Sequence, residues 1–253
     1  MIFNKFFILF KIGRKIGKSN IINIVSETHK IPVFIKLFFN LLAFSFSSSN
    51  NTKSKGKENL SESIQEMGTT FIKLGQFLAT RPDIIGEKLS KELESLQDKL
   101  PPFSKKEAEK IIIENLGQSN FDDIIDLSEP IAAASIAQVH KAKIKEDNII
   151  KNVAIKVLRP NIKKIFNDEI DAIMLLAYIV ESLISKTKRL KLIEVVFLFK
   201  EITNHEMDLR FEAAAANEYA ENTKNDLGFF VPKIYWNFTC LLYTSPSPRD
   251  TIR

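Results

Sequence analysis

Two runs of alternating apolar and polar residues, at 135–144 and 152–158, constrain the fold of this 253-residue chain most strongly. A period of two places successive side chains on opposite faces of a strand. The polar stretch KEDN separates the runs, so together they predict a β-hairpin. Elsewhere the apolar residues follow helical spacings. The sequence therefore predicts an α+β fold in which helices accompany a small antiparallel sheet.

Helical patterns precede the hairpin. From Leu60, apolar residues recur at spacings of three and four, which predicts a helix up to residues 80–83, where a proline breaks the run. A second helix is expected over 84–96. Ser104 and Glu107 have the spacing of a capping box, which opens a third helix.

Helical periodicity returns after the hairpin, over 161–178 and 192–221. The segment KIYWNFT, residues 233–239, then predicts a further strand because it is rich in β-branched and aromatic residues. The expected order is helices, hairpin, helices and strand.

Residues 1–59 are expected to form a membrane-proximal segment and a linker. Five cations interleave with Phe, Ile and Leu in the first eighteen residues, a pattern that favours an anionic membrane surface. Residues 31–47 are more apolar but fall short of the roughly 20 residues that span a bilayer. An interfacial or partner-packed helix is expected there, with a true span as the alternative. The polar run 47–59 indicates the linker.

Charge and cysteine content exclude several classes of site. The formal net charge is +5, but the lysines are scattered among acids and no Arg-rich face appears, so we expect no nucleic-acid partner. The single cysteine, Cys240, excludes a disulfide framework and a thiolate metal site.

The segment VAIK, residues 153–156, places a lysine on the second strand of the hairpin. Val153 and Ile155 are expected on one face, and Ala154 and Lys156 on the other. A long cation on a rigid strand is what a cleft for ATP phosphates requires. The alternative is an ordinary edge-strand lysine, because short apolar strands that end in Lys are common.

An alanine-rich stretch leads into the first strand of the hairpin; it consists of Ala132, Ala133, Ala134, Ser135, Ile136 and Ala137. In ordinary protein kinases a glycine-rich loop covers the phosphates at this place. Alanine permits close approach but resists positive φ, so we expect a stiffer nucleotide loop. The alternative is the start of an Ala-rich helix.

The segment EMDLRFE, residues 206–212, gathers three acids. If it is helical, Asp208 and Glu212 share one face, and Glu206 projects elsewhere. Such acids after a lysine-bearing strand suggest a Lys–Glu pair with further acids left over. The alternative is a solvated acidic helix face.

The segment TFIKLGQ, residues 70–76, places Lys73 and Gln76 on one helical face with Gly75 between them. A glycine inside a helix costs about 1 kcal/mol relative to alanine. We interpret Gly75 as a position that another backbone approaches closely.

These motifs lie within FIKLGQFLATRPDIIG, LQDKLPPF, EPIAAASIAQVHKA, VAIKVLRP and HEMDLRFEAAAANE, in that order. Together they resemble the UbiB family of atypical kinase-like proteins, from about residue 60 to residue 239. The resemblance implies a protein-kinase-like N-lobe at 129–239, preceded by a helical extension with the KxGQ motif at 60–128. In the family this extension folds over the active site and blocks the groove for protein substrates.

The resemblance also implies roles for the acids and for the KxGQ motif. Lys73, Gly75 and Gln76 would be the KxGQ residues that guard the site. Glu206 and Asp208 would be the family's ExD acids, close to the KxGQ lysine.

For the nucleotide, the resemblance implies that residues 132–137 form the loop over ATP and that Lys156 contacts the phosphates and pairs with Glu212. The implied function is ATP binding and ATP hydrolysis in support of ubiquinone biosynthesis. The implied place is the cytoplasmic face of the bacterial inner membrane, with a lipid or quinone precursor and other quinone-biosynthesis proteins as partners. Alternatives are a catalytically silent pseudokinase scaffold and, more distantly, a helical membrane adaptor without a nucleotide site.

A kinase-like enzyme also needs a catalytic loop with Asp and Asn and a metal-binding Asp. Neither follows Glu212, so we expect the C-lobe, and with it the Mg²⁺ ligands, to be missing. Residues 240–250, CLLYTSPSPRD, resemble the translation of a transposase-type sequencing adapter, with a native Ser/Pro tail as the alternative. We therefore expect residues 240–253 to be non-native, and the chain to be inactive and to expose apolar N-lobe surface.

Overall fold

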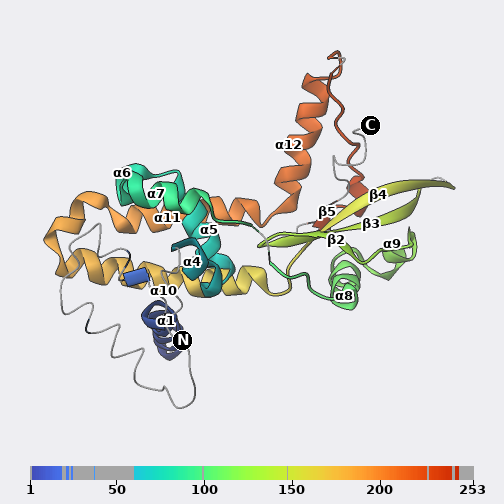
Figure 1. The fold of residues 1–253 in the computed structure, drawn as a ribbon. Coiled ribbons are helices and arrows are strands. Elements are labelled where there is room, and N and C mark those ends of the chain that lie inside the picture. Colours follow the sequence, from blue (N-terminus) through green and yellow to red (C-terminus); the bar gives the residue numbers. More distant parts are fainter. Residues whose placement is uncertain are drawn as a thin grey trace. The chain divides into compact units, whose positions relative to one another are not determined.

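The computed structural model shows a mixed α+β protein (Figure 1). It describes residues 2–18, 21–22, 24, 37, 60–98, 100–146, 148–226, 228–240 and 243–244. The chain divides into two compact units, one of residues 1–98 and 164–201, the other of residues 99–163 and 202–253. Helices together with a small antiparallel sheet confirm the predicted fold class.

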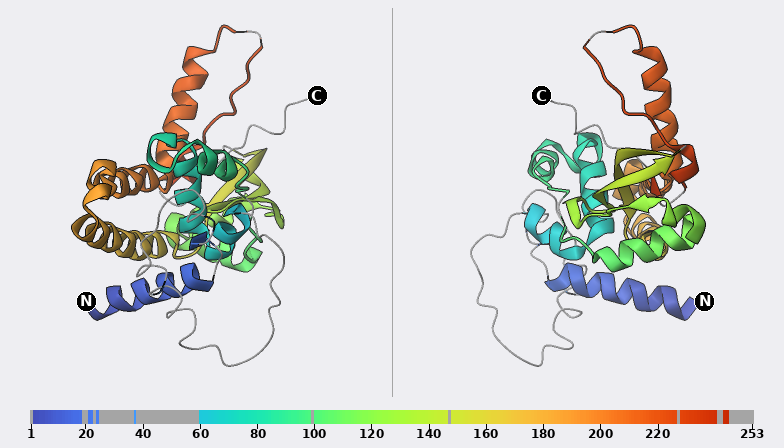
Figure 2. Two further views of the ribbon diagram at one scale, coloured as in Figure 1. Left: turned by 60° about the vertical axis from the view of Figure 1, so that its left-hand side comes forward. Right: turned by 90° about the vertical axis from the view of Figure 1, so that its right-hand side faces the viewer.

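The first unit is helical in its described residues. Its elements are α1 (Ile2–Lys18), α4 (Leu60–Met67), α5 (Thr69–Ala79), α6 (Pro82–Ile85), α7 (Glu87–Glu94), most of α10 (Ile162–Leu183), the 3-10 helix η1 (Ser185–Leu190) and most of α11 (Leu192–Glu206). The helices α10 and α11 run side by side (Figure 2). Lys200 Nζ lies 3.1 Å from Asp171 Oδ1, and the Glu181 carboxylate accepts the Ile193 N–H at 3.0 Å.

The predicted single helix from Leu60 is wrong, because Gly68 divides it into α4 and α5. Gly68 has a φ of 104°, which only glycine adopts without strain. The predicted break at 80–83 is confirmed, since α6 starts at Pro82. Gly86 separates α6 from α7, so the second predicted helix is also divided.

The N-terminal helix α1 is fastened to this unit through Lys15. Its Nζ donates to the Met67 carbonyl at 2.8 Å and lies 3.7 Å from Glu169 Oε1. The predicted helix at 31–47, except Leu37, and the predicted linker lie outside the described residues. Among the helices that are described, none has the length and apolarity that a bilayer crossing needs.

The second unit is built on one antiparallel sheet. Its strands are β1 (Ile124–Ile125), β2 (Pro130–Ala133), β3 (Ala137–Glu146), β4 (Ile149–Leu158) and β5 (Tyr243–Thr244). β3 pairs with β1, β2 and β4, and β4 also pairs with β5. The β3–β4 register is unbroken from the Ala137–Leu158 pair to the Glu146–Ile149 pair, which confirms the predicted hairpin.

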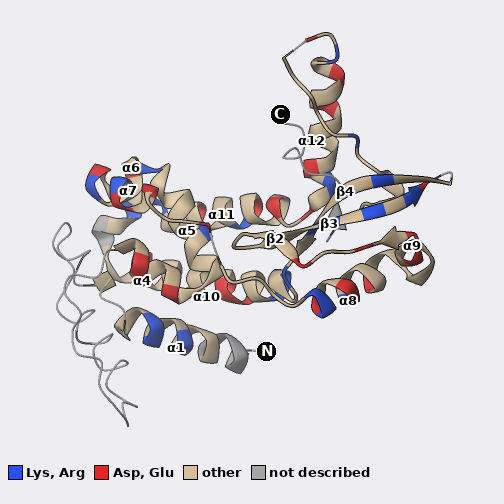
Figure 3. Cartoon of the chain, turned by 45° about the vertical axis from the view of Figure 1, so that its right-hand side comes forward, with Lys and Arg blue, Asp and Glu red and all other residues tan. Residues whose placement is uncertain are grey.

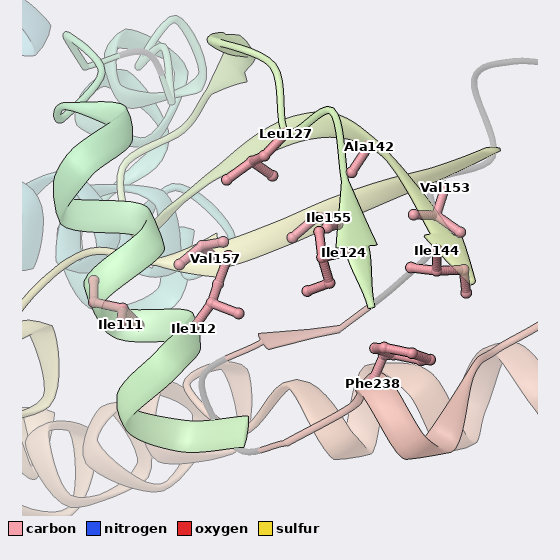
Figure 4. Packing of buried hydrophobic residues seen from close by; sticks show 10 residues of the cluster. All are labelled: Ile111, Ile112, Ile124, Leu127, Ala142, Ile144, Val153, Ile155, Val157 and Phe238. Atoms are coloured by element: carbon pink, nitrogen blue, oxygen red, sulfur yellow. The ribbon is translucent and has the colours of Figure 1, made fainter. Parts of the chain in front are cut away.

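The remaining elements of this unit are α8 (Lys105–Leu116), α9 (Gln118–Asp122), α12 (Leu209–Asn222) and the 3-10 helix η2 (Trp236–Phe238). The predicted cap of α8 is confirmed, because the Ser104 Oγ accepts the Glu107 N–H at 3.3 Å. The apolar face of α8 packs on the sheet (Figure 4).

The core of the second unit lies between α8, the β3–β4 hairpin and the segment of η2 (Figure 4). It consists of Ile111, Ile112, Ile124, Leu127, Ala142, Ile144, Val153, Ile155, Val157 and Phe238. Burial of each large side chain contributes about 1.5–3 kcal/mol, so this cluster fixes which face of β4 points inward.

The predicted strand at 233–239 is wrong. The backbone is irregular up to Tyr235 and then forms η2, with the Phe238 N–H bonded to the Tyr235 carbonyl at 2.9 Å. The Thr239 hydroxyl donates to the same carbonyl, also at 2.9 Å. These local bonds occupy groups that a strand ladder needs, and the turn directs Phe238 into the core.

Candidate functional site

An ion pair joins the hairpin to α12. Lys156 Nζ lies 2.9 Å from Glu212 Oε1 and 2.6 Å from Oε2, although 56 residues separate the two in the sequence. Val153, Ile155 and Val157 point into the core, so the alternation along β4 directs Lys156 to the opposite face, as predicted. Both side chains remain partly exposed.

The start of α12 is fixed by Asp208. This residue is the N-cap, and its Oδ1 accepts the Arg210 N–H at 3.1 Å. The Arg210 guanidinium also donates to both Asp208 carboxylate oxygens, with Nε 2.9 Å from Oδ1 and Nη2 2.7 Å from Oδ2. The first turn of α12, which carries Glu212, is thereby anchored.

The segment 206–212 is therefore not one helix. Glu206 is the exposed last residue of α11, and Asp208 has the extended φ and ψ of a cap, −115° and 95°. Asp208 and Glu212 do not share a helical face as predicted. A capping acid two residues before an arginine was the sequence signal for this arrangement.

The charge state of Asp208 is set by its neighbours. Hydrogen bonding from Arg210 lowers the pKa of Asp208, partly opposed by burial, and Lys163 nearby favours the same anionic form. Burial lowers the pKa of Lys163, opposed by the Asp208 carboxylate. A lowered carboxyl pKa stabilises the fold above the unfolded value of about 3.9, and this stabilisation is lost as the pH falls through the folded value.

The alanine-rich stretch forms a strand and a tight turn. Ala132 and Ala133 belong to β2, and the Ala134 N–H donates to the Ala137 carbonyl at 2.8 Å across the turn. The alternative of an Ala-rich helix is thus excluded, and β2 is a strand that the sequence did not predict. Ser135 is fully buried in the turn.

Lys156 and Ala132 of the alanine-rich stretch lie on the same face of the sheet. Ala132 pairs with Val139, and Val139 pairs with Lys156, so the three form one row across β2, β3 and β4. Residues directly opposite in antiparallel strands point to the same face. The turn that begins at Ala134 therefore starts two residues after Ala132, which lies in the same row as Lys156.

Two other lysines of the hairpin, Lys143 and Lys151, form ion pairs with acids. Figure 3 shows the charged residues along β3 and β4. Lys143 Nζ lies 2.6 Å from Asp126 Oδ2, and Lys151 Nζ lies 2.5 Å from Glu146 Oε2. The charges of these two lysines are thereby balanced.

The KxGQ residues Lys73, Gly75 and Gln76 lie on α5 in the first unit. Lys73 Nζ is 4.0 Å from Asp98 Oδ2. A Cβ added to Gly75 would lie 2.5 Å from Leu96 Cδ1, so the close neighbour is a side chain and not the predicted backbone. Because Lys156, Glu206 and Asp208 belong to the second unit, the guarding role of the motif stays a prediction.

The donor set at Lys156 fits a phosphate. An ammonium has three N–H donors and Glu212 accepts two, so one remains for a phosphate oxygen. Mg²⁺ has no comparable fit: within the described ranges, no three His, Cys, Asp or Glu side chains gather as a metal site.

Comparison with known proteins shows the family of this chain. The model of the ABC1 atypical kinase-like domain matches residues 95–241, which include Lys156, Glu212 and the alanine-rich turn. The chain belongs to this family.

Several curated relatives of this family member are named "Probable protein kinase UbiB". The protein from Marinobacter nauticus is 35% identical over 211 residues, which are 83% of this chain and 38% of that protein. The protein from Pseudomonas paraeruginosa is 32% identical over 232 residues, 91% of this chain and 43% of that protein. The protein from Cellvibrio japonicus is 34% identical over 210 residues, with shares of 83% and 38%. The chain thus spans about two fifths of the length of these relatives.

Proposed function

We propose that this chain carries the phosphate-binding part of an ATP site, in an atypical kinase-like protein that acts as an ATPase in support of ubiquinone biosynthesis. The observation that carries the proposal is the Lys156–Glu212 pair beside the alanine-rich turn. Exposed ion pairs contribute only about 0–1 kcal/mol to stability, so a gain in stability does not account for the Lys156–Glu212 pair.

Each residue has a defined part in this proposal. Lys156 neutralises charge on the α- and β-phosphates, and Glu212 holds the ammonium in place. Residues 132–137 lie over the nucleotide, and Asp208 fixes the helix that carries Glu212. The KxGQ residues of α5 guard the site, and Mg²⁺ is bound by other residues of the full-length family protein.

The place of action is proposed to be the cytoplasmic face of a bacterial inner membrane. The support is the interleaving of cations with apolar residues in the first eighteen positions, which suits anionic lipid. A lipid or quinone precursor and other quinone-biosynthesis proteins are the proposed partners, which the resemblance to the UbiB family implies.

The proposal is tested by equilibrium ATP binding to the 253-residue chain. Lys156→Met removes the cation and is expected to weaken ATP binding at least tenfold, because a charge-assisted bond is worth about 1.5–3 kcal/mol. Glu212→Gln keeps the side-chain shape but no longer fixes the ammonium, so a smaller loss is expected. Lys145→Met, at an exposed position near the end of β3, is the matched control.

Equal ATP affinity of Lys156→Met and wild type would contradict the proposal. Binding with normal Lys156 dependence but no ATP turnover in the full-length family protein would favour the scaffold alternative over the ATPase.

A further inference from the structure

Arg159 stands directly after β4, three residues beyond Lys156, and touches the alanine-rich turn. Its guanidinium donates to the Ala134 carbonyl through Nε at 3.1 Å and through Nη2 at 2.8 Å. The Nη2 group also lies 3.3 Å from the Leu100 carbonyl. One planar side chain thus joins two segments that are 34 residues apart.

The main chain of Arg159 holds the same turn from its other side. The Arg159 N–H donates to the Ile136 carbonyl at 2.8 Å. Two carbonyls of the turn, those of Ala134 and Ile136, therefore accept from a single residue. A further bond lies within the turn, from the Ala134 N–H to the Ala137 carbonyl.

A second set of contacts ties the segment before α8 to this turn. The Arg159 guanidinium carbon lies 5.9 Å from the centre of the Phe103 ring, within the range of a cation–π contact. Phe103 is fixed in turn by Gln138, whose amide accepts the Phe103 N–H at 2.9 Å and donates to its carbonyl at 3.1 Å. Leu100 precedes two prolines, which have no N–H to donate.

We propose that Arg159 is a positioning residue that fixes the alanine-rich turn in the shape that receives nucleotide phosphates. This inference rests on the proposed nucleotide site. A glycine-rich loop reaches such a shape through free backbone rotation, whereas this turn contains no glycine. Its shape is instead imposed by two guanidinium bonds to the Ala134 carbonyl and one main-chain bond to the Ile136 carbonyl, while a third guanidinium bond joins Arg159 to Leu100. Lysine cannot reproduce this fork, because an ammonium is a compact point donor.

The test compares Arg159→Met and Arg159→Lys with the control Lys145→Met in the 253-residue chain. Hydrogen exchange of residues 132–139 without nucleotide reports the turn itself, and titration with ATP and magnesium reports its use. Arg159→Met is expected to speed exchange at the turn about tenfold and to weaken ATP binding about tenfold. Arg159→Lys is expected to give roughly half of each effect on a logarithmic scale, and the control neither.

Unchanged exchange in Arg159→Met overturns the proposal, because the turn then keeps its shape without the guanidinium. Faster exchange with unchanged ATP affinity also overturns it, yet leaves the nucleotide site intact. Absence of ATP binding in wild type contradicts the proposed function itself. This outcome can be told apart from a failure of the Arg159 proposal, because hydrogen exchange still reports the shape of the turn. If circular dichroism shows that Arg159→Met is unfolded, Arg159→Lys decides, and wild-type ATP affinity in that variant overturns the proposal.

Discussion

At the scale of single residues, the hydrogen bonds of the buried side chain of His140 define its protonation state. His140 has no exposed surface, and its Nδ1 lies 2.8 Å from the Ser128 carbonyl, which requires a proton on Nδ1. Its Nε2 lies 2.9 Å from the Gln138 amide nitrogen and accepts from it. The neutral imidazole satisfies both contacts, whereas the imidazolium would face the amide donor with a second N–H.

Acid is therefore expected to destabilise the second unit through His140. Burial lowers the pKa of His140 in the fold, opposed by the Ser128 carbonyl, and the charged groups around it are Glu129, Lys105 and Glu109. Because the folded pKa is below the unfolded value of about 6.5, stability is complete above that pH and is lost as the pH falls toward the folded value.

The variant His140→Asn, which keeps a donor for Ser128, should flatten this dependence. The measurement is the urea midpoint at about pH 7.5 and about pH 5.5. The exposed His205→Asn serves as control and should keep the wild-type slope. An equally steep slope in His140→Asn would refute the assignment.

The cap at Asp208 gives a second prediction at this scale. Asp208→Ala removes an N-cap and is expected to cost about 1 kcal/mol of unfolding free energy. Asp208→Asn keeps the cap but loses the charge, so it should cost less and separate the two contributions. Both are measured by urea unfolding. Equal losses in the two variants would show that the ion pair to Arg210, and not the cap, holds the helix start.

At the scale of elements, Gly75 shows how α5 packs on its neighbours. A methyl group there would lie 2.5 Å from Leu96 Cδ1 and 3.4 Å from Ile64 Cγ2. Overpacking typically costs about 1–3 kcal/mol, which exceeds the roughly 1 kcal/mol that alanine gains in a helix. Gly75→Ala should therefore destabilise the first unit.

The same substitution should be favourable once Leu96 is shortened. In the Leu96→Ala background the added methyl meets no Cδ1, so the double variant is expected to be more stable than Leu96→Ala alone. A double-mutant cycle by thermal unfolding measures this coupling. Additive losses would mean that Leu96 is not what excludes a side chain at position 75.

Elements with a local signal were predictable from the sequence. The hairpin follows from period-two alternation and the start of α8 from the cap at Ser104. The division at Gly68 was not predictable, because the apolar spacing continues across it. The segment 233–239 has strand composition, but its local bonds and the burial of Phe238 favour a 3-10 turn.

The site was predictable in part for the same reason. Lys156 stands out because a strand pattern places it beside core residues, and its pairing with Glu212 was expected. The helix break at Asp208 was missed, because helical spacing runs through it. The contacts of Arg159 depend on backbone carbonyls, which leave no mark on composition or periodicity.

At the scale of the whole molecule, exposed aromatic side chains should govern solution behaviour. Tyr219, Phe229 and Phe230 are exposed near the end of α12, and the Tyr219 and Phe229 rings meet edge to face at 6.1 Å. Exposed apolar groups of this kind promote association. Phe229→Ser with Phe230→Ser is expected to lower self-association without lowering the unfolding temperature.

Sedimentation over a range of concentrations measures this effect. The control is Ile149→Ser with Ile150→Ser, which removes exposed apolar side chains at the hairpin end instead. A larger decrease in association for the control pair would assign self-association to the hairpin.

Lysine labelling with an acyl-phosphate derivative of ATP reports whether Lys156 contacts nucleotide phosphates. The amine attacks the acyl carbonyl, so only a lysine beside the bound phosphates is acylated, with release of ATP. We expect that Lys156 is acylated, that excess ATP prevents this acylation, and that Lys145 shows no such protection. Acylation of Lys156 that ATP does not prevent, or ATP-sensitive labelling at Lys73 or Lys163 instead, would contradict the contact of Lys156 with the phosphates.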